Sequence, residues 1–203
     1  MTMKTKSLVM TSALIFAFCG AFSQKMKLKG DMKFMKEVKA LDLEFTYDNM
    51  SVGKYDAEEE YLSERVAKRN EDEPGKGDEW RENWVNDRAE RFEPKFEELI
   101  NDYLNKEGIK AGREMGDAPY KAVIHTTHTE PGFNVGVVRK SAHINVEVMF
   151  INKESGETVA TMDFKKVPGR DAMGYDFDTG YRLQEAYAKL GKEIGKYIVK
   201  KVL

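Results

Sequence analysis

The chain has 203 residues, with 33 Lys and Arg against 35 Asp and Glu, so its formal net charge is −2. This near balance does not favour nucleic acid as a partner, because nucleic-acid-binding domains carry a marked basic excess. Beyond residue 23, no apolar run approaches the length needed to cross a bilayer, so we expect no transmembrane segment there.

The first 23 residues have the pattern of a secretory signal peptide. Two lysines precede an apolar run from Leu8 to Phe18, and Ala21 and Ser23 place small residues at a cleavage site. We therefore expect residues 1–23 to be removed and residues 24–203 to form one exported domain, either periplasmic or extracellular.

Cys19 is the only cysteine of the chain. A lipoprotein signal carries a small residue before its lipid-accepting cysteine, whereas Phe18 stands here, so we do not expect a lipid anchor. Cleavage after Ser23 would leave no cysteine for a disulfide or for nucleophilic catalysis.

The first half of the chain predicts one strand followed by helices. Residues 24–36 are basic and rich in Met, and form either a loose arm or the approach to a strand. Residues 41–48 alternate between apolar and polar side chains, which predicts a half-buried strand. Helices are expected at 56–70, where Asp56 and Glu59 have the spacing of a capping box, at 78–92, and at 93–108, which ends at Gly108.

The second half predicts three strands and a final helix. The strands are expected at 120–130, 141–151 and 157–167, with a turn at Gly156 between the last two. Residues 179–203 place apolar side chains at helical spacing, and Asp178 or Thr179 is the expected N-cap. Gly191 and Gly195, one turn apart, predict close packing of this helix on a sheet.

The element order is therefore β-α-α-(α)-β-β-β-α, which indicates an α+β fold. We expect a two-layer sandwich in which helices cover one face of a mostly antiparallel four-stranded sheet.

Two of the three histidines, His125 and His128, lie three residues apart in the predicted strand 120–130. Side chains alternate along a strand, so if Ala122 and Ile124 point inward, His125 points outward and His128 points toward the other layer. A strand therefore separates these two rings, whereas a helix would place them on one side for a shared metal ion.

A second set of polar residues is expected on the outer face of the sheet: His125, His143, Glu147 and Asp163. Imidazoles and carboxylates are zinc ligands, and an open coordination position would allow a metal-bound water to act as nucleophile. We predict that Asn145 lies opposite Asp163 and that Glu147 lies opposite Thr161. An ordinary solvated face is the favoured interpretation, and a zinc-dependent hydrolase is the alternative.

Residues 129–141 form a long connection between two strands, with four apolar side chains that would be partly exposed. Such a loop predicts a contact with a ligand or partner protein, while a hairpin that folds back onto the core is the alternative. The four residues are Phe133, Val135, Val137 and Val138.

Two further sets of charged residues receive a structural interpretation. Asp171, Asp176 and Asp178 precede the last helix and suggest a cap, with cation binding as the alternative, since the EF-hand spacing is not met. The lysines of the last helix are interpreted as its solvated face rather than as a lipid-binding surface. They are Lys189, Lys192, Lys196, Lys200 and Lys201.

The strands AVIHTTHTE, HINVEVMFI and ETVATMDFKK, followed by DTG and an amphipathic last helix, resemble small α/β domains of bacterial envelope proteins. Examples are the amino-terminal domain of TolB and the curli-secretion lipoprotein. The resemblance covers residues 117–203 and implies an assembly or binding role in the envelope, but it carries over no functional residue.

The chain contains no nucleophile elbow, HExxH, P-loop or dinucleotide fingerprint. We therefore expect a non-enzymatic binding or assembly module without a cofactor, whose partner is an envelope protein or another envelope component. The oligomeric state is left open.

Overall fold

The computed structural model describes residues 25–134, 139–169 and 178–203. The expected signal peptide, including Cys19, lies outside the described residues, as do Val135, Val137, Val138, Asp171 and Asp176.

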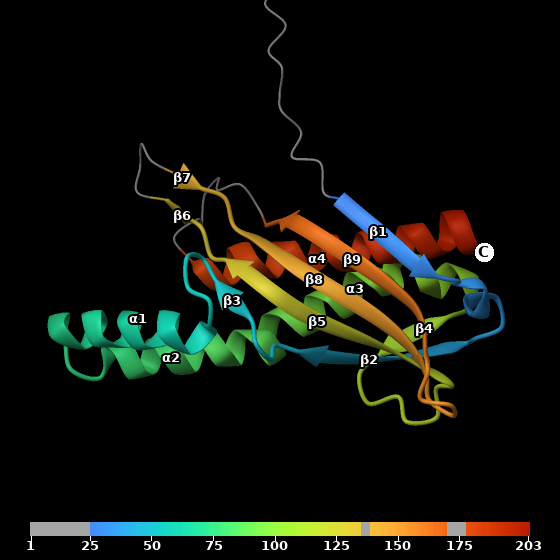
Figure 1. Cartoon of the computed structure of the whole chain (residues 1–203), viewed down its shortest axis with the longest axis horizontal. Coiled ribbons are helices and arrows are strands. Elements are labelled where there is room, and N and C mark those ends of the chain that lie inside the picture. Colours follow the sequence, from blue (N-terminus) through green and yellow to red (C-terminus); the bar gives the residue numbers. More distant parts are fainter. Residues whose placement is uncertain (1–24, 135–138, 170–177) are drawn as a thin grey trace, which may run out of the picture.

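A seven-stranded sheet forms one layer of the molecule, and its main path runs in the order β1-β9-β8-β5-β2-β4, with β3 paired to β5 (Figure 1). Its strands are β1 (Lys25–Gly30), β2 (Ala40–Thr46), β3 (Ser51–Val52), β4 (Lys110–Gly112), β5 (Tyr120–Glu130), β8 (His143–Asn152) and β9 (Thr158–Pro168).

The sheet is mixed, so the expected mostly antiparallel four-stranded sheet is wrong. β1, β9, β8 and β5 pair antiparallel, whereas β2 pairs parallel with both β5 and β4, and β3 pairs parallel with β5. The physical reason is the helical segment between β2 and β5. A long crossover returns the chain to the sheet in its starting direction, and two strands joined in this way run parallel.

Two of the main helices cover one face of the sheet, and the other two extend beyond its end. α3 (Glu93–Leu104) and α4 (Thr179–Tyr197) lie side by side behind the sheet, while α1 (Glu58–Asp72) and α2 (Lys76–Asp87) form a projecting pair (Figure 1). We call this pair the helical arm. Short helical segments are η1 (Lys33–Lys36), η2 (Arg88–Phe92), η3 (Asn105–Glu107) and η4 (Ile198–Val202).

The helix caps were predicted with mixed success. Asp178 is the N-cap of α4, and its carboxylate accepts hydrogen bonds from the backbone N–H groups of Gly180 at 2.8 Å and Tyr181 at 3.3 Å. The capping box at Asp56 is wrong, because α1 begins at Glu58 and its N-cap, Ala57, offers no side-chain acceptor.

The core lies between the inner sheet face and the pair α3–α4. Gly191 and Gly195 allow α4 to approach the backbone of α3 rather than the sheet, which corrects the sequence expectation. A Cβ atom at Gly191 would collide with the carbonyl oxygen of Phe96. Side chains buried in this core include Leu41, Ile124, Val146, Phe150, Phe164, Ile100, Leu104, Leu190 and Ile194.

Within the described ranges, none of the helices combines the length and the apolar character that crossing a membrane requires.

Candidate functional site

A β-bulge in β5 decides which histidines share a face of the sheet. Thr126 lies opposite Val146 on β8, but the next paired residue of β5 is His128, opposite Asn145. Thr127 is therefore an extra residue, and it reverses the alternation that follows it. His128 lies on the same outer face as His125, so the prediction that it faces the other layer is wrong.

The bulge brings His128 next to His143 of β8. The two imidazole rings lie 5.7 Å apart between centroids, and Nδ1 of His128 is hydrogen-bonded to the hydroxyl of Ser51 at 2.8 Å. Burial lowers the pKa of both histidines from the ordinary value of 6.5, because it disfavours the imidazolium form. The neighbouring His128 lowers the pKa of His143 further, while Glu130 acts in the opposite direction on both.

Two buried charged side chains fix the turn that follows β5. Glu130 is 7% exposed, forms an ion pair with Lys140 and accepts the N–H of Gly132 at 3.1 Å. Arg182 of α4 is 5% exposed, and its Nε donates to the carbonyl oxygen of Pro131 at 3.2 Å. We call these four positions, Glu130, Pro131, Gly132 and Arg182, the hairpin root.

Above the hairpin root, β6 (Phe133–Asn134) and β7 (Arg139–Lys140) pair as a separate two-stranded sheet. Figure 1 shows this hairpin projecting from the end of β5 and β8. The side chain of Phe133 is 43% exposed. Of the four residues predicted as a contact, Phe133 is the one that the structure describes.

The structure places three of the four candidate zinc ligands in one row. His125, Glu147 and Asp163 are successive Cα partners across β5, β8 and β9. The predicted pairings of Glu147 with Thr161 and of Asn145 with Asp163 are wrong. Glu147 pairs with Asp163 and Met149 with Thr161, because the β8–β9 register shifts near the turn, between Phe150 and Ile151.

The fourth candidate ligand, His143, lies four residues from Glu147 along β8, which is about 13 Å of strand. His125 is already hydrogen-bonded through Nδ1 to the Thr46 hydroxyl at 2.9 Å. Across the described residues, no group of three or more His, Cys, Asp or Glu side chains is placed to hold a metal ion. Zinc binding by the four residues stays a prediction.

Asp178, one of the three aspartates considered as cation ligands, has hydrogen-bond partners within the protein. Besides capping α4, its carboxylate accepts a hydrogen bond from the Arg91 guanidinium at 2.7 Å, which lowers its pKa against the effect of burial. The other two aspartates of that alternative are not described.

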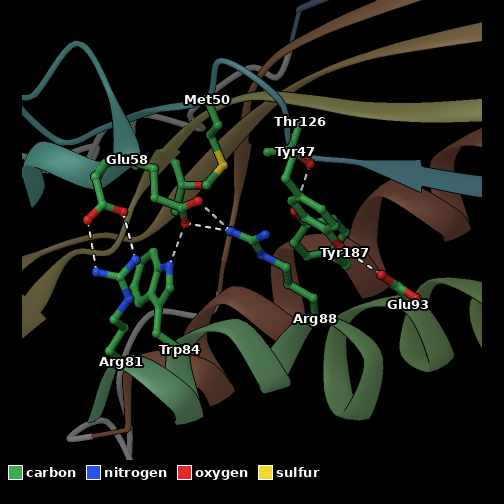
Figure 2. A network of polar contacts seen from close by, with 11 residues as sticks. Tyr47, Met50, Glu58, Arg81, Trp84, Arg88, Glu93, Thr126 and Tyr187 are labelled. Carbon is green, nitrogen blue, oxygen red and sulfur yellow. Dashed lines mark hydrogen bonds and ion pairs between the residues drawn. The ribbon is translucent and has the colours of Figure 1, made fainter. Parts of the chain in front are cut away.

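A polar network that the sequence did not predict joins the helical arm to the sheet (Figure 2). The Glu58 carboxylate accepts hydrogen bonds from Nε1 of Trp84 and from Nη2 of Arg88, both at 2.6 Å. The Arg88 guanidinium in turn lies over the ring of Tyr47, 4.3 Å from its centroid. One carboxylate thereby connects α1, α2 and η2.

The same network continues to α4 through Tyr187, which is buried, and Tyr47, which is partly buried. The hydroxyl of Tyr187 lies 2.7 Å from that of Thr126, and the Tyr47 hydroxyl donates to Glu93 at 3.3 Å. Burial raises the pKa of both tyrosines well above the ordinary range, so both phenols are neutral at physiological pH. Because Glu58 and Arg88 are paired with each other, we interpret the network as structural.

No protein-family model matches the chain, and no curated protein matches it. Among solved structures, the dodecameric PelC of Paraburkholderia phytofirmans shares 10% identity with a TM-score of 0.39, over 85% of this chain and 98% of PelC. The protein XCC0632 of Xanthomonas campestris, assigned to the DUF330 family, shares 10% identity with a TM-score of 0.34, over 50% of this chain and 57% of its own. Scores this low establish neither a shared fold nor a function, and the resemblance to TolB is not confirmed.

Proposed function

We propose that this chain is a non-enzymatic binding or assembly module of the bacterial cell envelope, and that Phe133 contacts its partner. The observation that carries the proposal is an exposed aromatic side chain on a hairpin whose root is fixed by buried charges. An apolar side chain held outward in a defined position loses little entropy on binding, and aromatic residues are common anchors of interfaces.

The envelope location rests on the sequence of residues 1–23, which has the pattern of an export signal. The partner is expected to offer an apolar pocket for Phe133. The Lys140–Glu130 pair beside it provides a polar rim of the kind that surrounds interface anchors.

Site-specific photo-crosslinking tests the proposal. A photoreactive phenylalanine analogue replaces Phe133 in one variant and Val85 in a matched control, whose side chain is 42% exposed on the helical arm. Irradiation in the envelope of the source cell is expected to give a discrete adduct from position 133 and none from position 85. Equal adducts from both positions, or none from position 133, would contradict the contact.

The alternative function is a zinc-dependent hydrolase, and the observation in its favour is the row formed by His125, Glu147 and Asp163. It predicts one zinc ion per chain in the purified protein, with loss of that zinc in His125→Ala and in Asp163→Ala. Elemental analysis measures this directly, and a zinc-free wild-type protein excludes the alternative.

A further inference from the structure

A groove lined by lysines runs between β1 and the C-terminal half of α4. It has a volume of about 370 Å³, and its apolar floor is formed by Met26, Phe164 and Tyr197. We call this the lysine groove. Its charged lining consists of Glu193 with Lys189, Lys196, Lys200 and Lys201. A second hollow along β1 shares Tyr197 and Lys201 with it and adds Lys36, together with Lys33 and Asp31, which form an ion pair with each other.

The four lysines of the groove have no acidic partner among the described residues. Several lysines elsewhere do form ion pairs, as Lys121 does with Glu44 and Lys153 with Asp42. None of the four forms an ion pair or a side-chain hydrogen bond with another described residue. A protein whose formal net charge is −2 therefore concentrates uncompensated positive charge in one place.

The spacing of these lysines is too wide for one small anion to contact all four of them. Lys189 and Lys201 are separated by 12 residues of continuous helix, which is about 18 Å at the usual rise per residue. A phosphate or carboxylate contacts only neighbours within a few ångström. An extended surface that repeats its negative charges matches this distribution.

The apolar floor narrows the choice among extended anionic surfaces. Met26 is 36% exposed at the groove, although most apolar side chains of the sheet are buried. A bilayer that contains anionic phospholipid offers negative head groups and an apolar layer just beneath them. Lysines suit this boundary because their long stems contact apolar surface while the ammonium groups reach the head groups.

We propose that the lysine groove docks the protein on a bilayer surface that contains anionic phospholipid. β1 lies at the edge of the sheet, as its end position in the strand order shows, so a flat surface can approach the groove from that side. This contact is independent of the one assigned to Phe133, which lies on the hairpin beyond the ends of β5 and β8 (Figure 1).

Vesicle sedimentation of the purified protein tests the proposal with two matched variants. The first carries Lys196→Glu, Lys200→Glu and Lys201→Glu in the groove. The second carries Lys39→Glu, Lys68→Glu and Lys110→Glu at exposed positions elsewhere, with the same change in net charge. Circular dichroism and thermal unfolding verify that both variants fold.

The wild-type protein is expected to bind vesicles of phosphatidylcholine with phosphatidylglycerol more tightly than vesicles of phosphatidylcholine alone. The groove variant should lose roughly a hundredfold in affinity for the anionic vesicles, at about fivefold per lysine, while the control variant keeps most of it. Equal losses in both variants would overturn the proposal, since net charge alone would then explain binding. Groove-dependent binding of soluble polyglutamate without binding to vesicles would also overturn it, in favour of an acidic polymer.

Discussion

At the scale of single residues, the pair His128–His143 is the feature that depends most on tertiary structure. One inserted residue, Thr127, brings the two rings to one face, where burial and mutual proximity disfavour protonation. Histidines in the unfolded chain bind protons at their ordinary pKa, which is higher than that of the folded pair. The two states therefore differ in proton uptake below about pH 6.5.

This difference predicts that acidification destabilises the protein. As the pH falls through the ordinary histidine value, the unfolded state binds more protons than the folded state, so the free energy of unfolding decreases. The loss continues until the pH passes the lowered pKa of the folded pair. Urea unfolding from about pH 7.5 to about pH 5.5 measures the slope.

The double variant His128→Gln/His143→Gln is expected to show a shallower dependence of stability on pH than the wild-type protein. Thr161→Gln, a change on the same sheet that adds no titratable group, should keep the wild-type slope. An unchanged slope in the double variant would show that other groups cause the pH dependence.

At the scale of secondary-structure elements, the helical arm is held to the body by Glu58. Its ion pair with Arg88 has side chains only 18% and 19% exposed, whereas the neighbouring pair Glu59–Arg81 is 63% and 43% exposed. Ion pairs screened by water contribute little to stability, but removal of one partner from a largely buried pair leaves the other uncompensated.

Glu58→Gln is therefore expected to lower the free energy of unfolding by about 2–3 kcal/mol, a value reduced from the fully buried case because water still reaches the pair. Glu59→Gln, its matched control one residue away, should cost much less, because water screens its ion pair. Urea denaturation of both variants checks the contrast. Similar losses would mean that Glu58 has no special role in holding the arm.

At the scale of the whole molecule, the main feature that the sequence predicted wrongly is the direction of the strands in the sheet. The predicted order placed helices between the first long strand and the next one, and that order by itself signals a parallel crossover. β1, β3 and β4 were not predicted as strands. β3 and β4 are each three residues long or shorter, which is too short for an alternating pattern to be recognised, and the basic residues of β1 were also consistent with a loose arm.

The candidate site was predictable only in part, for a similar reason. The position of Phe133 on an exposed connection follows from its neighbours in the chain. In the network that holds the helical arm, Trp84 and Arg88 lie 26 and 30 residues after their partner Glu58, and no local pattern indicates that these side chains meet. Nor does the sequence indicate that the lysines of α4 face a groove instead of open solvent.

The sequence by itself determined the features that depend on near neighbours. These are β5 at residues 120–130, the positive φ of Gly156, the cap at Asp178 and the amphipathic last helix. Alternation, turn chemistry and capping all act within a few residues, so they can be recognised without the fold. The tertiary structure alone decided the mixed strand directions, the bulge that pairs His128 with His143, and the docking of β1 beside α4. Each of these depends on hydrogen bonds and packing between segments far apart in the chain, whose pairing is selected by the stability of the whole sheet.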